Sequence, residues 1–232
     1  MGQVFIPGNP PIEISLRRSA RARRISLRVS RLDGRVTLSL PQFTPEREGI
    51  AFATSKADWL RSILGARSAP QRAELGAMLP IEGRPRLITA GSTRAIRLTD
   101  AQIEVPGAPE RVPVRLAAWL KVLARDRLAV ACDRYAAALG VSYGPLSLRD
   151  TRSRWGSCAH DGRLMFSWRL IMAPPEVLSY VAAHEVAHRV EMNHSEAYWA
   201  VVNRIYPGWQ RQRAWLRSEG QSLQLWDFGG LE

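Results

Sequence analysis

Three of the four histidines in the chain fall within eleven residues, at His184, His188 and His194. The first two belong to the run His184-Glu185-Val186-Ala187-His188. On an α-helix, positions i and i+4 share one face, so both imidazoles can bind one metal ion while the carboxylate between them points towards a bound water. This spacing predicts a helix that holds a catalytic zinc ion.

A catalytic zinc ion takes three protein ligands and keeps one position open for water. His194 is the expected third ligand, and Glu191 and Glu196 are acidic alternatives. In the longer motif His-Glu-x-x-His-x-x-Gly-x-x-His, the glycine turns the chain so that the third histidine reaches the metal. Glu191 stands at that glycine position here, and Asn193, which tolerates left-handed backbone geometry, is the candidate for making the turn.

Bound zinc would lower the pKa of its water, and the carboxylate of Glu185 would take the proton and return it to the leaving group. Glu185 is therefore the expected catalytic residue. Hydrolysis also needs a group that stabilises the oxyanion. The sequence offers four candidates without choosing among them: Tyr180, Tyr198, Arg154 and Arg169.

The elements around this motif read as a helix and two strands. Pro174-Pro175-Glu176 is suited to the first turn of a helix, and the apolar run 177–183 that follows would bury it. Upstream, residues 146–149 and 164–171 are predicted strands, with Asp161-Gly162 as the turn before the second. Before them, residues 114–139 have helical spacing and stop at Gly140.

The first half of the chain is rich in strand signals. Residues 25–29 and 35–40 alternate around Asp33-Gly34 and predict a β-hairpin, and short strands are expected between residues 80 and 105. Residues 45–64 read as one helix with Trp59 in its apolar stripe. The segment Pro106-Gly107-Ala108-Pro109 is the expected boundary between a β-rich domain, residues 1–108, and a hydrolase domain, residues 109–232. The predicted fold class is α+β.

The composition is that of a folded globular protein: 232 residues, 46% hydrophobic and 23% charged. The net charge of +12 is almost all arginine, since only Lys56 and Lys121 are lysines. Eight arginines lie between residues 17 and 35, where they form either a solvated face or a phosphate-binding face. Cys132 and Cys158 match no disulfide or zinc pattern and predict free thiols. We find no signal peptide and no membrane span, so we expect a soluble, cytoplasmic protein that does not bind membranes.

Several segments together resemble the YgjP-like metal-dependent hydrolases, which are related to the SprT-like zinc metallopeptidases. The resemblance rests on an ordered series of motifs: Arg154-Trp155-Gly156-Ser157-Cys158, Trp168-Arg169-Leu170-Ile171, Ala173-Pro174, the His-Glu-x-x-His run, Met192-Asn193-His194-Ser195 and Tyr198-Trp199. The arginine-rich hairpin and the helix ending near Trp59 also resemble that family. Ser167 and Glu196 depart from the family pattern, where asparagine and proline are common.

The resemblance implies a compact zincin-like domain of the small gluzincin type, following a β-rich N-terminal part. Carried over by position, His184, His188 and His194 would bind zinc, and Glu185 would be the catalytic acid and base. The residues expected to line a substrate cleft are Arg154, Trp155, Trp168 and Tyr198.

A metallopeptidase acting on peptides or unfolded proteins is the favoured function, with the substrate added as a strand beside residues 164–171. One alternative is a metal-dependent pyrophosphohydrolase of nucleoside triphosphates such as UTP. Another is a DNA-associated protease like the SprT-like relatives, which would bind nucleic acid through the basic hairpin.

Overall fold

The structure of the chain is a computed structural model, which describes residues 2–30, 33–65 and 69–229. The chain divides into two compact units, Met1–Ala69 and Pro70–Glu232. The expected boundary between residues 108 and 109 falls inside the second unit instead. There Ile103 and Val105, before that point, share one hydrophobic core with Val112 and Leu116, after it. A segment that joins two halves of one core is a loop and not a domain linker.

Unit 1 begins with a four-stranded sheet of order β1-β2-β4-β3. Strands β2 and β4 are parallel, whereas β1 with β2 and β3 with β4 are antiparallel. The predicted hairpin is confirmed in β3 and β4, although Arg31 and Leu32 lie outside the described residues. The strands are β1 (Gly2–Ile6), β2 (Ile12–Ser19), β3 (Ser26–Val29) and β4 (Val36–Pro41).

Two helices, α1 (Glu46–Ser55) and α2 (Ala57–Gly65), occupy the segment predicted as one helix. They are separated at Lys56, which caps the end of α1. Leu60 packs into the core of unit 1, but Trp59 is 46% exposed, so its predicted core position is wrong. Neighbouring residues on a helix point about 100° apart. The side of α2 that carries Leu60 packs on the sheet, so Trp59 points away from it.

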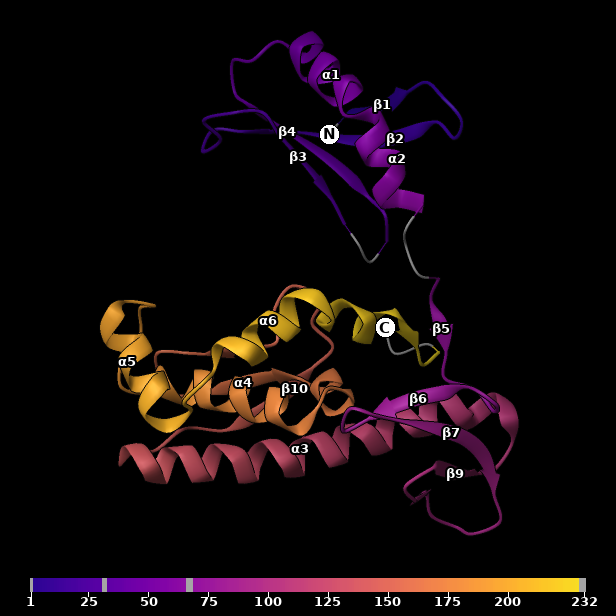
Figure 1. Cartoon of the computed structure of the whole chain (residues 1–232), viewed down its shortest axis with the longest axis vertical. Helices are drawn as coiled ribbons and strands as arrows, with labels where there is room; N and C mark the ends of the chain where they lie inside the picture. Colours follow the sequence, from indigo (N-terminus) through magenta and orange to yellow (C-terminus); the bar gives the residue numbers. More distant parts are fainter. Residues whose placement is uncertain (1, 31–32, 66–68, 230–232) are drawn as a thin grey trace. The chain divides into compact units, whose positions relative to one another are not determined.

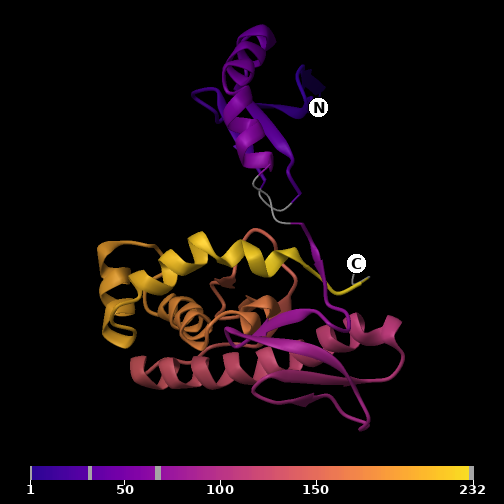
Figure 2. The same cartoon turned by 45° about the vertical axis from the view of Figure 1, so that its right-hand side comes forward.

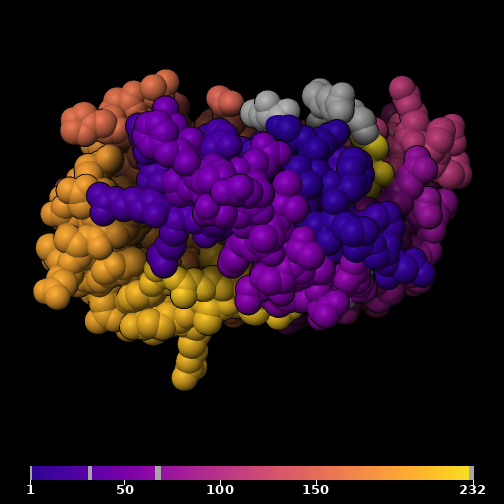
Figure 3. All heavy atoms as spheres, turned by 90° about the horizontal axis from the view of Figure 1, so that it is seen from above, coloured from indigo at the N-terminus to yellow at the C-terminus, as the bar shows by residue number. Residues whose placement is uncertain are grey.

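The arginines of the basic hairpin are solvent-exposed at residues 17, 18, 21, 23, 24, 28 and 35. Side chains project from the surface of unit 1 in the space-filling view (Figure 3, indigo to purple). Arg18 is committed to the fold, because it donates hydrogen bonds to the carbonyl oxygens of Gln42 and Thr44. The exposure of these side chains fits a solvated face, and it gives nucleic-acid binding no support.

Unit 2 starts with a second four-stranded sheet, of order β6-β7-β9-β8, that packs on one end of the long helix α3 (Val112–Leu139). Helix α3 runs along the length of unit 2 and also lies against α4 (Figures 1 and 2). It stops at Gly140 in left-handed geometry, as predicted. The strands of this sheet are β6 (Met78–Ile81), β7 (Arg84–Gly91), β8 (Arg97–Leu98) and β9 (Gln102–Pro106). The short strand β5 (Gln71–Arg72) precedes the sheet, and the short helix η1 (Pro109–Arg111) precedes α3.

A three-stranded sheet lies next to the histidine motif. It consists of β10 (Leu146–Arg149), β11 (Gly156–Cys158) and β12 (Leu164–Ser167), in the order β10-β12-β11. The strand predicted over 164–171 is shorter than expected, because the chain enters the 3₁₀ helix η2 (Trp168–Met172). Strand β12 is paired on both sides, so a peptide cannot add to it as predicted. Its two edge strands are β10 and β11, and of these β11 lies against α4.

The C-terminal part consists of α4 (Pro175–Ala187), α5 (Glu196–Ile205), α6 (Gln210–Ser218), η3 (Gly220–Leu225) and β13 (Trp226–Asp227). Strand β13 pairs with β5, and Trp226 and Phe228 are buried, so the end of the described chain is docked. Cys132 and Cys158 are free thiols, as predicted. Among the described helices, none is long and apolar enough to cross a membrane.

Candidate metal centre and active site

Helix α4 positions the first part of the site. Pro174 caps the helix, Pro175 stands in its first turn and the carboxylate of Glu176 lies near its positive end, as the sequence predicts. Most side chains of the helix are buried, so its rotation about its own axis is fixed. His184 and Glu185 lie in the last turn of α4, and His188 follows directly as its C-cap.

The chain returns to the site by a compact turn after α4. The backbone N–H groups of Arg189 and Val190 donate to carbonyl oxygens three residues earlier, at 2.9 Å and 3.0 Å. The prediction that Asn193 adopts left-handed geometry is wrong, since Glu82 is the one non-glycine residue with positive φ in the described ranges. Tight turns at the helix end therefore replace the missing glycine. Ser195 then caps α5 by accepting a hydrogen bond from the backbone N–H of Tyr198.

The three histidines form one cluster, in which the candidate ligand nitrogens all lie within 4.8 Å of one another. Nε2 of His184 lies 3.1 Å from Nε2 of His194. Two nitrogens bound to one tetrahedral zinc ion are about 3.3 Å apart, given Zn–N distances of about 2.0–2.1 Å. The donor set and its spacing therefore fit zinc. Neither Glu191 nor Glu196 belongs to the cluster.

Neighbouring groups orient the imidazoles. Nδ1 of His188 donates to the carbonyl oxygen of Glu191 at 3.1 Å, which leaves its Nε2 lone pair for a metal. The ring of Tyr198 stacks on His188 with centroids 4.5 Å apart, and its hydroxyl donates to the carbonyl oxygen of His184 at 2.9 Å. Burial and the neighbouring histidines lower the pKa of His184 to about 3, so this imidazole is neutral, as a ligand must be.

Glu185 is 4% exposed and lies against strand β11. A Cβ atom at Gly156 would lie 2.5 Å from its Oε1 oxygen and 2.7 Å from its Cγ atom, so a larger residue at this point of the strand would displace the Glu185 side chain. Burial raises the pKa of Glu185 to about 8, although a hydrogen bond from the Cys158 backbone and the charge of Arg154 oppose that shift. A carboxyl group with a pKa near neutrality is suited to accepting a proton and returning it.

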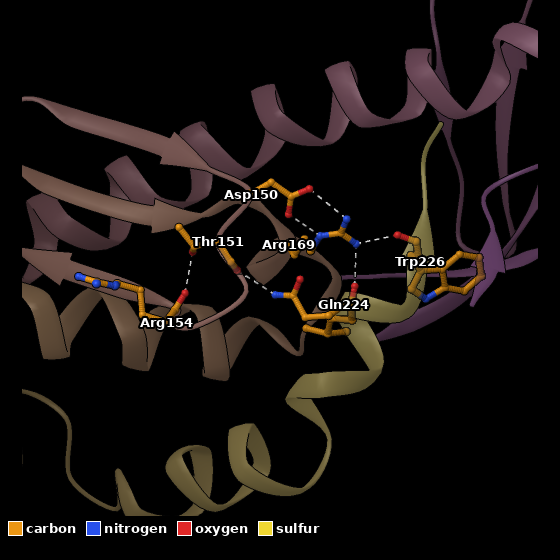
Figure 4. Close-up of polar contacts among 7 residues, drawn as sticks. Asp150, Thr151, Arg154, Arg169, Gln224 and Trp226 are labelled. Carbon is orange, nitrogen blue, oxygen red and sulfur yellow. Dashed lines mark hydrogen bonds and ion pairs between the residues drawn. The ribbon is translucent and has the colours of Figure 1, made fainter. Parts of the chain in front are cut away.

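A buried arginine braces the loop between β10 and β11 (Figure 4). Arg169 binds Asp150 with two hydrogen bonds, at 2.6 Å and 3.0 Å, and donates from Nη1 to the carbonyl oxygens of Leu223 and Trp226. The C-terminal segment thereby packs against the loop that leads to Gly156. Arg169 has its donors committed here, so it is not available to stabilise an oxyanion.

The same loop is held at two further points (Figure 4). Gln224 donates to the carbonyl oxygen of Thr151 at 3.2 Å, and the Thr151 hydroxyl donates to the carbonyl oxygen of Arg154 at 2.7 Å. The side chain of Arg154 extends away from these contacts, and it forms no ion pair among the described residues. Its charge nevertheless acts on Glu185. Of the four oxyanion candidates, Arg169 and Tyr198 have their donors committed, whereas the Arg154 guanidinium and the Tyr180 hydroxyl form no hydrogen bond with side chains or backbone of the described residues.

The structure does not bring every predicted cleft residue to the site. Trp168 is 1% exposed and packs edge-on against Phe228, so it belongs to the core. Tyr198 is fully buried and contacts the ligands instead of lining a cleft. Trp155 is half-buried, and its ring meets Gly220 of the C-terminal segment. Tyr180 is also buried, with its ring facing Tyr206 and His184.

Two residues of the site had no individual role predicted: Gly156, which was noted only as part of the motif 154–158, and Asp150. Gly156 borders Glu185, and the signal that could have found it is a glycine inside a strand, which marks a close approach of another group. Asp150 anchors Arg169, but a single aspartate after a short strand carries no signal of such a role.

Comparisons with known proteins show the family to which the chain belongs. A comparison with curated proteins found no match. Among solved structures, the chain is similar to the metallopeptidase zymogen abylysin of Pyrococcus abyssi, with 19% identity, 41% of this chain and 95% of that chain covered, and a TM-score of 0.34. A family model described as "YgjP-like, metallopeptidase domain" matches residues 23–219. The match confirms the resemblance predicted from the motifs, and the chain belongs to the YgjP-like metallopeptidase domain family.

Proposed function

We propose that the chain is a zinc-dependent peptidase with a zincin-like domain, in which His184, His188 and His194 hold the metal and Glu185 is the general base. One observation carries the proposal. The Nε2 atoms of His184 and His194 are separated by nearly the distance expected for two ligands of one tetrahedral zinc ion. The buried carboxyl group of Glu185 comes directly after His184 in the helix. Membership of a metallopeptidase family supports the same reaction class.

A zinc ion bound to the three imidazoles would supply a Lewis acid that polarises a peptide carbonyl and lowers the pKa of water. The carboxylate of Glu185 accepts a proton from the attacking water and donates it to the nitrogen of the departing amine. The buried surroundings that raise the pKa of Glu185 favour the first of these transfers, because they stabilise the protonated carboxyl group. Arg154, whose charge acts on Glu185 and which forms no ion pair among the described residues, is the proposed partner of the oxyanion.

The substrate is proposed to bind along the free edge of β11. Backbone N–H and C=O groups on an unpaired strand edge accept an extended peptide as one more strand. Strand β11 lies against α4, and Gly156 touches Glu185, so a peptide paired with this edge passes the carboxyl group. The absence of a side chain at Gly156 leaves room for the Glu185 side chain beside this strand.

The test is metal-dependent cleavage of an unfolded protein. The full chain is stripped with a chelator and assayed on unfolded casein, before and after one equivalent of zinc is restored. We expect cleavage to fall at least about 100-fold on metal removal and to return with zinc, since the Lewis acid and the activated water are lost together. Phosphate release from nucleoside triphosphates is measured on the same samples. Zinc-dependent nucleotide turnover without peptide cleavage would overturn the proposal.

A further inference from the structure

Two stacked tryptophans lie beside the histidine cluster. Trp199 of α5 has its ring centroid 5.9 Å from that of His184 and 5.8 Å from that of His194. Trp209, at the start of α6, stacks on Trp199 with centroids 4.1 Å apart and planes 17° from parallel. Both rings are half-buried. They form a solvent-accessible aromatic surface next to the candidate metal ligands.

Arg213 of α6 lies on this surface. Its Cζ atom is 4.9 Å from the ring centroid of Trp199 and 5.6 Å from that of Trp209. The side chain is half-buried and forms no ion pair with any carboxylate of the described residues, in contrast to Arg169 and Arg127. Arg213 thus contacts the same Trp199 ring that lies beside His184 and His194, which places its charge next to the site.

A guanidinium group on aromatic rings keeps its hydrogen-bonding capacity. The cation–π contact uses the faces of the tryptophans, while the N–H donors in the guanidinium plane stay free for an anion. A carboxylate matches this fork with two parallel hydrogen bonds. The aromatic support also restricts the side chain, so less conformational entropy is lost when an anion binds.

We propose that Arg213, supported by Trp199 and Trp209, binds a carboxylate of the substrate and makes the enzyme selective for peptides with an acidic group near the cleaved bond. The inference rests on the proposed peptidase function and names its substrate class. The carboxylate belongs either to an aspartate or glutamate side chain or to the C-terminus of the peptide.

The test compares matched fluorogenic peptides cleaved by the zinc-loaded chain. One series replaces glutamine by glutamate at each position near the cleaved bond, and a second compares free with amidated C-termini. We expect about a tenfold higher kcat/KM for the carboxylate-bearing member of one series, as for a charge-assisted hydrogen bond at a partly exposed site. The responding series identifies the source of the carboxylate.

Variants separate recognition from packing. We expect Arg213→Gln to lose the selectivity and Arg213→Glu to reverse it in favour of lysine-bearing peptides, which loss of a packing contact would not do. Arg134→Gln is the matched control, because Arg134 also lies over an aromatic ring, that of Tyr135, at 5.4 Å. Equal selectivity of the wild-type chain and Arg213→Gln would overturn the inference.

Binding is measured independently of turnover. Glu185→Gln chains, with and without Arg213→Gln, are titrated with the same peptides while tryptophan fluorescence is followed. Tighter binding of carboxylate-bearing peptides that requires Arg213 supports the inference even if the wild-type chain cleaves no peptide, an outcome that would refute the proposed function alone. Peptides that bind equally well with and without a carboxylate would overturn the inference alone.

Discussion

Replacing Glu185 by glutamine is expected to lower kcat/KM for peptide cleavage by about 10²- to 10⁴-fold, the range for loss of a general base. Glutamine has nearly the shape of glutamate, so it fits against Gly156 without disturbing β11. It cannot accept a proton from water. Glu185 does not belong to the cluster of candidate metal ligands, so the variant is expected to bind zinc like the wild-type chain. Steady-state kinetics and metal analysis on the same preparation check both statements.

The control for this variant is Glu196→Gln, which makes the same chemical change in the exposed first turn of α5. It lies close to the histidines in sequence but outside their cluster. We expect its kcat/KM to stay within about twofold of the wild-type value, as for surface substitutions remote from the chemistry. If Glu185→Gln retained wild-type turnover, the assignment of the base would be wrong.

Replacing Arg169 by alanine is expected to lower the free energy of unfolding of the second unit by about 3 kcal/mol. Loss of one partner of a buried ion pair costs about 3–5 kcal/mol. The lower end applies because the side chain of Asp150 is 35% exposed and recovers hydration. The carbonyl oxygens of Leu223 and Trp226 lose a donor at the same time, so the C-terminal segment is expected to detach first. Urea denaturation followed by tryptophan fluorescence measures the change.

Arg163→Ala is the matched control, because Arg163 also pairs with an aspartate, Asp161, at 2.7 Å. The side chains of Arg163 and Asp161 are both more than half exposed, so we expect the free energy of unfolding of this variant to stay nearly unchanged. Similar unfolding midpoints for Arg169→Ala and the wild-type chain would show that the Arg169 contacts do not stabilise the C-terminal segment.

The histidine cluster was largely predictable from the sequence because its geometry is local. The i, i+4 spacing places His184 and His188 on one side of the chain at the end of one helix, and only a short turn separates them from His194. The ends of the helices were similarly predictable. Pro174 and Gly140 act through the backbone conformations they allow, which need no knowledge of the rest of the fold.

Features that depend on long-range packing were not predictable. The edge position of β11 follows from the pairing of three strands and is not encoded in its own three residues. Trp168 was expected in a substrate cleft and is buried, whereas Trp59 was expected in the core and is exposed. The burial of a tryptophan depends on which element covers it. The segment 106–109 has the composition of a linker, but the packing of β9 and α3 into one core makes it a loop.

Zinc content of histidine variants tests the central claim most directly. The full chain and its variants are stripped with a chelator, equilibrated with zinc, desalted and analysed by mass spectrometry for metal per chain. We predict one zinc per chain for the wild type and for His160→Ala, which removes the exposed histidine outside the cluster.

For His184→Ala and His194→Ala we predict at least about a 100-fold loss of zinc affinity, because even partners of the ligands contribute about 10- to 100-fold. Retention of one firmly bound zinc by both variants would contradict the assignment of the metal centre.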